Sequence, residues 1–352
     1  MFDMPDLGGP SALSATNMDD ESSSPSTAQV ISAPSENPLY ASTQPTTSLL
    51  SPQLTVYSDD HIVAGLSQYP TTAGQTLVIL KNLHADLFSL QVGDFTKIMI
   101  QVSNIAKYLR FFYHVRRCAL VTEGGNSLSI IPLHGLNKVW QPILSRFKEF
   151  HEGFPGYISS IDRPRMSDTR LDTTCAQIRM VSGISSPLNH SFHGDQSDDN
   201  LFAKIVRSEL PQWRVWEDDE HVAFLSPFAN TPGFTVIVPR AHLSSDIFSL
   251  DEEAYVKLVA AAHIVARILK EAFSANCCGM ILEGFEINYA HVKLIPKHRT
   301  AENAPNSRAP YEENYQGYVT SLQGPLFKDI ESLADNAVSF AKLLCQEPCE
   351  PI

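Results

Sequence analysis

The strongest constraint on the fold is an internal repeat, whose two copies lie about 160 positions apart. Residues 72–90 read TAGQTLVILKNLHADLFSL, and residues 231–250 read TPGFTVIVPRAHLSSDIFSL, with one extra residue. Further matched pieces follow in the same order, among them Glu123-Gly124 and Glu283-Gly284. A repeat of this length is that of a whole domain, so each copy should fold around its own core.

Length and composition agree with two domains and additional segments. The chain has 352 residues, of which 43% are hydrophobic. The start is rich in Ser, Thr and Pro and poor in aromatic residues, a composition that does not bury enough apolar surface to offset the entropy of ordering. We therefore expect a disordered tail, a degenerate first copy, a flexible linker, and a second copy with a C-terminal helix, at residues 1–50, 51–164, 165–198 and 199–346.

Charge and cysteine content limit the possible partners. The formal net charge is −13, which argues against a general nucleic-acid or anionic-membrane binder, because such binding needs clustered Lys and Arg. No apolar run approaches the roughly 20 residues that span a bilayer, and the start lacks a secretory signal pattern. The six cysteines form no convincing disulfide or metal framework. We expect an intracellular protein, cytoplasmic or nuclear, without a metal or other cofactor.

Hydrophobic periodicity predicts an antiparallel α+β fold for each copy. In the second copy, short apolar runs predict strands, and residues 251–273 show helical spacing, with Ser249 and Glu252 as a predicted capping box. The first copy repeats this order with a helix over Asp94–Phe112, and a final helix is predicted from about Leu326 to Leu344. Each domain is therefore expected to combine an antiparallel sheet with one long amphipathic helix.

One segment of the second copy carries chemistry. Residues 289–296 read YAHVKLIP, with polar-capable side chains at every second position. On a strand this spacing puts Tyr289, His291 and Lys293 on one face and apolar residues on the other. We expect the apolar face to pack and the face with His291 to open to solvent.

At this point the second copy resembles the histidine triad family of nucleotide hydrolases and transferases. The resemblance covers nearly all of residues 200–298 and rests on an ordered series of segments. These are Asn200–Arg207, Val215–Asp219, Ala223–Leu225, Pro232–Phe234, Val238–His242 and His291–Pro296. In this family the closing strand carries alternating histidines, and the middle one attacks the α-phosphate of a nucleotide.

The resemblance implies roles for individual residues. Counting back from Pro296 puts His291 at the nucleophile position, with Tyr289 and Lys293 replacing the flanking histidines. An imidazole nitrogen can form a phosphoramidate that water later opens, which divides one difficult displacement into two. Lys293 would add positive charge beside the phosphate. By resemblance, the nucleotide-binding set comprises Phe202 and Phe224 near the base, Ser226 near the ribose and Asn288 near the phosphates.

The first copy has lost the histidine. Counting back from Pro132 puts Ser127 at the nucleophile position, Ser129 at the third position and Gly125 at the first, in a turn four residues shorter. A serine without a neighbouring base is a weak nucleophile, so this copy is expected to be silent. Because family members commonly form homodimers, we expect the two copies to pair within the chain as a pseudo-dimer.

Three functional hypotheses follow. The first is an enzyme that binds a nucleotide or dinucleotide phosphate, forms a nucleotidyl intermediate on His291, and passes it to water or another acceptor. The second is a non-catalytic nucleotide-binding or interaction protein, since the flanking histidines are lost. The third is a purely structural tandem domain without nucleotide affinity.

Overall fold

A computed structural model describes residues 50–82, 86–184, 186–298 and 308–345. Residues 44–352 form one compact unit, to which all of these segments belong. The tail predicted to be disordered lies, apart from Leu50, outside the described residues. Within the described part, no helix is both long and apolar enough to cross a membrane.

Apart from a short helix that opens the second copy, the two copies share the order strand, strand, strand, helix, strand, strand. The first copy contains β1 (Thr55–Ser58), β2 (Ile62–Leu66), β3 (Thr76–Leu80), α1 (Val92–Phe112), β4 (Arg117–Thr122) and β5 (Ser127–Leu133). The second contains α3 (Leu201–Val206), β6 (Arg214–Glu217), β7 (His221–Leu225), β8 (Thr235–Pro239), α4 (Glu252–Ala272), β9 (Cys278–Leu282) and β10 (Val292–Pro296). The α+β class with two antiparallel, helix-backed copies is as predicted from the sequence.

The long helices agree closely with the expected ranges, although the cap of α4 differs. Asp251, and not Ser249, is the N-cap, and its side chain accepts a hydrogen bond from the amide of Ala254. Ser249 ends a short 3-10 turn instead. The acidic Glu252 and Glu253 in the first turn favour this end of the helix electrostatically.

All ten strands form one sheet, in the order β1-β2-β3-β5-β4-β9-β10-β8-β7-β6. The copies meet where β4 pairs antiparallel with β9: Val121 lies opposite Ile281, Leu120 opposite Leu282, and Thr122 opposite Met280. Since Leu120 corresponds to Met280 and Thr122 to Leu282 in the repeat, the same positions meet from both sides. The register is therefore symmetric about Val121 and Ile281.

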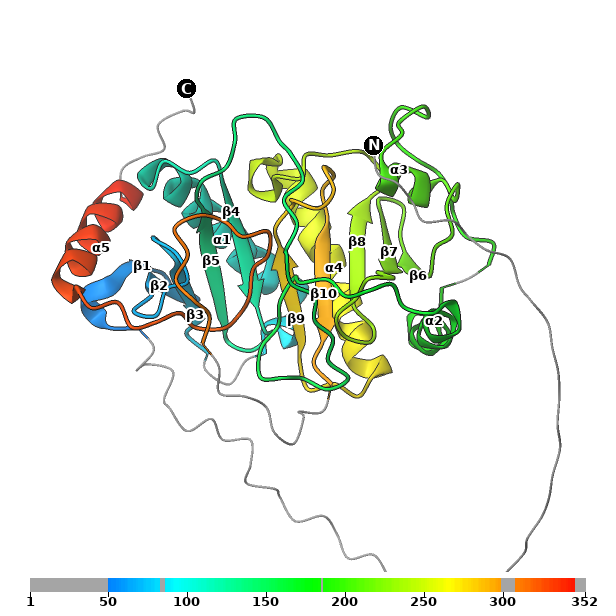
Figure 1. Ribbon diagram of the computed structural model, residues 1–352, viewed down its shortest axis with the longest axis horizontal. Helices are drawn as coiled ribbons and strands as arrows, with labels where there is room; N and C mark the ends of the chain where they lie inside the picture. Colours follow the sequence, from blue (N-terminus) through cyan, green and yellow to red (C-terminus); the bar gives the residue numbers. More distant parts are fainter. Residues whose placement is uncertain (1–49, 83–85, 185, 299–307, 346–352) are drawn as a thin grey trace, which may run out of the picture. The chain divides into compact units, whose positions relative to one another are not determined.

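The sheet is covered on both faces. Helices α1 and α4 lie against one face and against each other (Figure 1). The segments that follow β5 and β10 cross the other face (Figure 1). They meet at an antiparallel bridge between Ser159 and Thr320, which are equivalent positions of the repeat. The irregular segments thus cover the face that carries the polar positions of β10.

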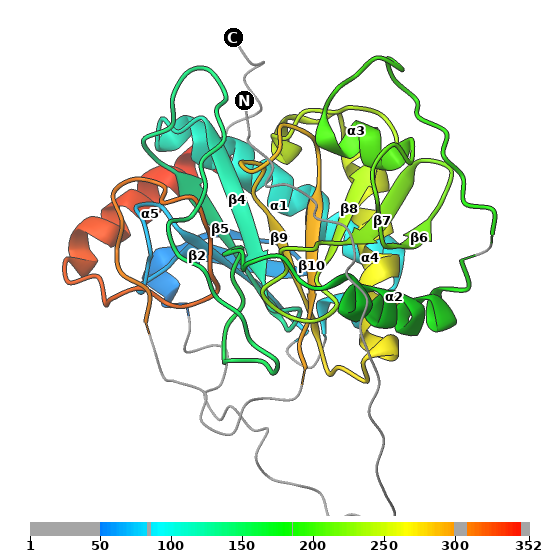
Figure 2. The ribbon, with the colours of Figure 1, turned by 45° about the vertical axis from the view of Figure 1, so that its right-hand side comes forward.

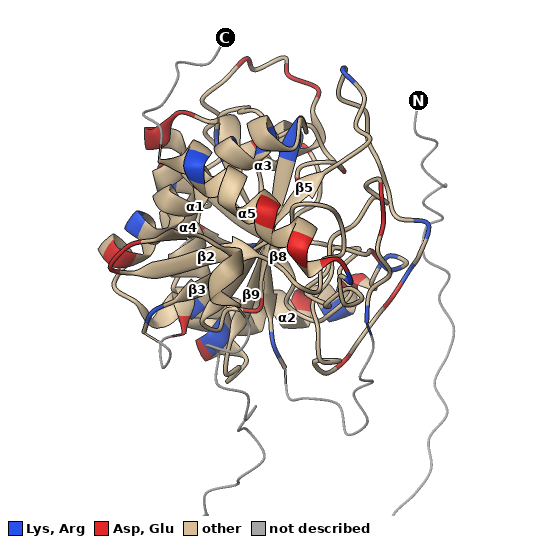
Figure 3. Ribbon diagram, turned by 90° about the vertical axis from the view of Figure 1, so that its left-hand side faces the viewer, with Lys and Arg blue, Asp and Glu red and all other residues tan. Residues whose placement is uncertain are grey.

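Each copy is followed along the chain by a helix that packs against the other copy. Helix α2 (Asp168–Ser182) follows the first copy but packs against α4 and β6 of the second (Figure 2). Helix α5 (Ile330–Leu344) follows the second copy but packs against α1 and β1 of the first. Figure 3 views the α5 side of the unit, where acidic and basic residues are interspersed along the ribbon.

Helix α2 corrects the expectation of a flexible linker over residues 165–198. Its Leu171, Cys175 and Ile178 are buried at the same spacing as Leu333, Ala337 and Phe340 of α5. Polar residues of α2 also bind the second copy, since Gln177 donates to the backbone oxygen of Ala272 and Arg179 to that of Arg214. A local reading of this Thr-rich and Asp-containing segment therefore suggested an unstructured connection.

Candidate functional site

The strand registers define which positions of the two copies correspond. Lys293 lies opposite Ile281 on β9, and Ser129 lies opposite Val121 on β4, which is the equivalent neighbour. Two residues earlier in each copy stand His291 and Ser127. The sheet therefore supports the alignment by which the first copy carries serine at the position of His291.

His291 is buried and fixed in one orientation. Its side chain is packed beside Phe202, and the residue is 2% exposed. Nδ1 lies 2.7 Å from the backbone oxygen of Tyr289. Because a carbonyl oxygen only accepts hydrogen bonds, Nδ1 carries the proton and the lone pair of the neutral ring is on Nε2.

Burial also fixes the charge of this ring. Removal from water disfavours the imidazolium form, and the nearby Lys293 ammonium disfavours it further, so that the pKa of His291 is lowered to about 4. The hydrogen bond to Tyr289 acts in the opposite direction but does not compensate. At neutral pH His291 is thus an uncharged imidazole with a free nitrogen lone pair.

Lys293 lies in a buried cluster of acidic residues. Its ammonium pairs with Glu283, at 3.2 Å, and with Glu286. Burial alone would lower the pKa of Lys293, but the two carboxylates outweigh it and raise the pKa. The hydroxyl of Tyr315 donates to Glu283, and burial together with Glu286 raises the pKa of Asp162 to about 6. The sequence did not single out these partners, although Glu283 is one of the repeated residues.

Contacts of its hydroxyl and of its ring hold Tyr289 in place. Its hydroxyl donates to the backbone oxygen of Pro239 at 2.7 Å, and its ring stacks on His242 with centroids 4.6 Å apart. His242 in turn places Nδ1 2.7 Å from Asp198 and Nε2 2.7 Å from the backbone oxygen of Asn288. His242 lies at the surface and also braces the segment that presents His291.

The predicted nucleotide-binding residues divide into two pairs. Phe202 on α3 lies with its ring centroid 5.4 Å from that of His291 and 5.6 Å from that of Phe224. Ser226 instead accepts a hydrogen bond from the amide of Phe228, and Asn288 accepts one from the hydroxyl of Ser245. The structure therefore brings Phe202 to His291, with Phe224 packed on the ring of Phe202, and engages Ser226 and Asn288 in local contacts.

The expectation that this face opens to solvent is wrong. Tyr289, His291 and Lys293 are all buried, with 0%, 2% and 3% exposure. The strand is also shorter than expected, because β10 begins at Val292 and Tyr289 and His291 precede it. Phe202 nevertheless contacts the rings of both Tyr289 and His291. Irregular segments that are distant in sequence cover this face. Strand periodicity does not predict such cover.

Part of the cover comes from the first copy. The indole nitrogen of Trp140 donates to the backbone oxygen of Gly284 at 3.0 Å, and the amide of Ile143 donates to that of Phe285 at 3.1 Å. Arg117 donates to the hydroxyl of Ser245 at 2.8 Å. The loop between β9 and β10 is thus held by residues of the copy that lacks the histidine.

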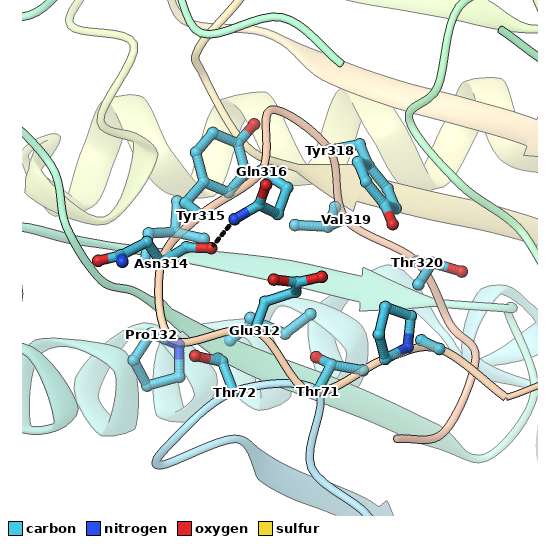
Figure 4. Close-up of a pocket in the computed structure, with 14 residues that line it drawn as sticks. Thr71, Thr72, Pro132, Glu312, Asn314, Tyr315, Gln316, Tyr318, Val319 and Thr320 are labelled. Carbon is cyan, nitrogen blue, oxygen red and sulfur yellow. Dashed lines mark hydrogen bonds between the residues drawn. The ribbon is translucent and has the colours of Figure 1, made fainter. Parts of the chain in front are cut away.

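A separate cavity, of about 50 Å³, lies beside β5 of the first copy (Figure 4). Its wall includes Thr71, Thr72, Glu312 and Tyr318, and none of the predicted site residues lines it. Among the described residues, no group of three or more His, Cys, Asp or Glu side chains is arranged to hold a metal ion. The chemistry of the candidate site therefore rests on His291 and its immediate neighbours.

Comparison with known proteins agrees with this strand and its surroundings. The HIT-domain family profile matches residues 207–301. A HIT-like protein of Mesomycoplasma hyorhinis is 31% identical over 108 residues, which are 29% of this chain and 95% of the relative. A second HIT-like protein, from Borreliella burgdorferi, is 28% identical over 106 residues, covering 28% of this chain and 76% of the relative. The chain belongs to the HIT family.

Two solved structures are similar to part or most of the chain. A HIT-like protein from Bartonella henselae, described as involved in cell-cycle regulation, is 24% identical with a TM-score of 0.27 and covers 42% of this chain and 98% of its own. A uridylyltransferase structure is 13% identical with a TM-score of 0.45 and covers 89% of this chain and 95% of its own.

Proposed function

We propose that this HIT-family protein is a nucleotide phosphohydrolase or nucleotidyltransferase with His291 as its nucleophile. The observation that carries the proposal is the orientation of the imidazole. Nδ1–H is directed to the backbone oxygen of Tyr289, so the free lone pair is on Nε2. A ring that is neutral at pH 7 and held by one nitrogen is ready to attack with the other.

The proposed reaction has two displacements. In the first, Nε2 of His291 forms a bond to the α-phosphorus of a nucleotide, and the bond from phosphorus to the leaving-group oxygen breaks with its electron pair. In the second, water or another acceptor forms an oxygen–phosphorus bond and the nitrogen–phosphorus bond breaks. The acceptor's proton passes to solvent, and His291 returns to its neutral form.

Access to His291 requires that the loop between β9 and β10 move. Gly284 and Phe285 in this loop are held by Trp140 and Ile143, and Glu286 is held by Lys293. We propose that substrate binding displaces Glu286 from Lys293, so that the ammonium turns to the phosphate oxygens. Loop motions that gate access to a site occur in many enzymes.

The direct test is turnover of nucleotide polyphosphates and nucleoside phosphoramidates by His291→Ala. We expect a loss of about 10³-fold or more, as for removal of a catalytic nucleophile. Ser127→Ala, the same position of the first copy, is the matched control and should retain the parent rate. Equal turnover by the parent and His291→Ala would remove the mechanism.

A second candidate function is nucleotide binding without turnover. The observation that favours it is the neutralisation of Lys293 by Glu283 and Glu286, together with the commitment of the Tyr289 hydroxyl to Pro239. Calorimetry with a non-hydrolysable nucleotide separates the candidates. Binding that Phe202→Ala weakens, without turnover of any nucleotide polyphosphate or phosphoramidate supplied, would select this function.

We further propose that the two copies act as the covalent equivalent of a HIT homodimer. The β4–β9 pairing and the contact between α1 and α4 support this. In this arrangement the first copy has no nucleophile of its own but holds the loop over the nucleophile of the second. This division of roles between the copies predicts that substitutions at Trp140 alter turnover at His291.

A further inference from the structure

We propose that the first copy carries a second anion site, for a phosphate group, at the basic cavity between the start of β4 and the segment after β5. The cavity has a volume of about 180 Å³. Three cationic residues line it: Arg116, Arg117 and Lys138. None of the residues proposed to act on the nucleotide lines this cavity, so the inference goes beyond the proposed function.

Two of the three cations are unpaired within the part of the chain that the structure describes. Arg116 and Lys138 are exposed, and neither forms a salt bridge or a side-chain hydrogen bond with a described residue. The chain as a whole has a net charge of −13, so uncompensated cations that share one cavity wall are unusual for it. Their mutual repulsion is relieved by an anion between them.

The third cation is already held in place. Arg117 is half-buried, donates to the hydroxyl of Ser245 at 2.8 Å, and lies with its guanidinium 5.0 Å from the ring centroid of Phe285. The oxygens bound to it are neutral, and the nearby carboxylate of Asp246 pairs with Arg110 at 3.1 Å. Arg117 therefore retains positive charge toward the cavity and loses little conformational freedom when a ligand binds.

The remaining wall indicates the class of ligand. Asn137 and Gln141 offer amide donors, and Trp140 provides an aromatic surface. The cavity is smaller than the roughly 300–1,000 Å³ that accommodates a drug-sized molecule. A phosphate ion or the phosphate end of a phosphate monoester matches both the size and the charge, because arginine recognises phosphate through several parallel hydrogen bonds.

The basic residues belong to the first copy alone. In the repeat, Asn276 and Cys277 stand where Arg116 and Arg117 stand in the first copy. The copy that lacks the histidine thus has the arginines, and the copy with the histidine lacks them. This opposite distribution indicates a function of the first copy that is separate from turnover at His291.

The test measures binding of inorganic phosphate to the full chain by equilibrium dialysis, with tryptophan fluorescence as a second readout because Trp140 lines the cavity. We expect the double variant Arg116→Gln/Lys138→Gln to weaken phosphate binding about tenfold or more, since it removes two of the three cations that line the cavity. Both residues are exposed, so the variant should fold. The charge-matched control is Lys328→Gln/Lys342→Gln, two exposed lysines distant in sequence, and it should bind as the parent does.

Two further arms locate the site and its source of phosphate. His291→Ala should bind inorganic phosphate with unchanged affinity, because the two sites are separate. If a phosphate monoester also enters the cavity, AMP should compete with inorganic phosphate. If the double variant weakens the binding of AMP but not that of inorganic phosphate, the phosphate group that the cavity binds is that of a nucleotide. Absence of binding of either probe to the parent, unchanged binding by the double variant, or loss of inorganic phosphate binding in His291→Ala would each overturn the proposal.

Discussion

The two copies place different side chains at equivalent positions in and before the last strand of each copy. Where β10 and the residues before it carry Tyr289, His291 and Lys293, the first copy carries Gly125, Ser127 and Ser129. Helices α1 and α4, which lie behind the two strands, are each 21 residues long. Strands β5 and β10 each lie next to the central β4–β9 pair of one continuous sheet. The fold of a copy therefore does not require the candidate site residues, because the first copy folds without them. The candidate site does require both copies, since segments of the first copy cover it.

The largest expected effect comes from giving the second copy the residue of the first. Lys293→Ser leaves the buried Glu283 and the partly buried Glu286 without their cation, and breaking such a buried pair costs about 3–5 kcal/mol. Urea unfolding measures this. Buried carboxylates without a cation have raised pKa values, so the loss should be larger at pH 7 than at pH 5. Adding Glu286→Gln should recover part of the stability.

The matched change in the first copy is Ser129→Ala, which removes no buried charge and should cost less than about 1 kcal/mol. Equal destabilisation by Lys293→Ser and Ser129→Ala would contradict the assignment of the acidic cluster to the second copy.

A somewhat smaller effect tests the exchange of α2 and α5. Ile178→Ala in α2 and Phe340→Ala in α5 each open a cavity in a buried contact, at about 2–5 and 3–5 kcal/mol. Hydrogen exchange should show where the protection is lost. For Ile178→Ala we expect it in β6 of the second copy, and for Phe340→Ala in β1 of the first. The reverse pattern, with each helix supporting the copy it follows, would refute the exchange.

How far the sequence predicts this molecule depends on the range of the interaction. The repeat correctly predicted the order of elements, the helix over Glu252–Ala272, and the alignment of His291 with Ser127, because each follows from local periodicity or from comparison of the copies. Helix α2 escaped prediction because its partners lie in the other copy. The closed face of β10 escaped for the same reason.

Within the site, the sequence identified His291, Lys293 and the aromatic pair Phe202 and Phe224. It did not predict that Glu283 and Glu286 hold Lys293, because these glutamates lie at the end of a strand and in a loop whose path the sequence leaves open. The stacking of His242 on Tyr289 likewise depends on tertiary packing. The candidate residue His291 was thus accessible to sequence reasoning, and its electrostatic setting was not.

The pH dependence of stability sharpens the comparison between His291 and Ser127. The pKa of His291 is lowered to about 4 in the folded chain, so between about pH 4 and 6.5 the unfolded chain binds a proton that the folded chain excludes. Stability should therefore rise with pH across this window, by up to about 1.4 kcal/mol per pH unit from this group.

The measurement is urea unfolding at several pH values for the parent and His291→Asn. The variant should lose this share of the slope, whereas Asp162, whose raised pKa acts with the opposite sign, is present in both proteins and cancels in the difference. Ser127→Asn is the control in the first copy and should leave the slope as in the parent. Parallel curves for the parent and His291→Asn would contradict a buried, neutral imidazole.

The smallest expected effect concerns the pairing of the two long helices. The hydroxyl of Tyr255 on α4 donates to the backbone oxygen of Met99 on α1 at 2.9 Å, and the first copy carries Phe95 at the equivalent position. Tyr255→Phe makes the two positions identical and should cost about 0.5–1.5 kcal/mol by losing one buried hydrogen bond. Thermal unfolding checks this, and an unchanged or higher Tm would argue against the contact.

The most direct measurement of the central claim is a search for a covalent nucleotidyl group on His291. The full chain is mixed with a nucleotide labelled at the α-phosphate, quenched in alkali, where phosphoramidates persist, and digested for peptide mapping. We expect label on the peptide that contains His291, lost in His291→Ala and retained in Ser127→Ala. Hydrolysis of the nucleotide without labelled peptide, or label that persists in His291→Ala, would contradict the account.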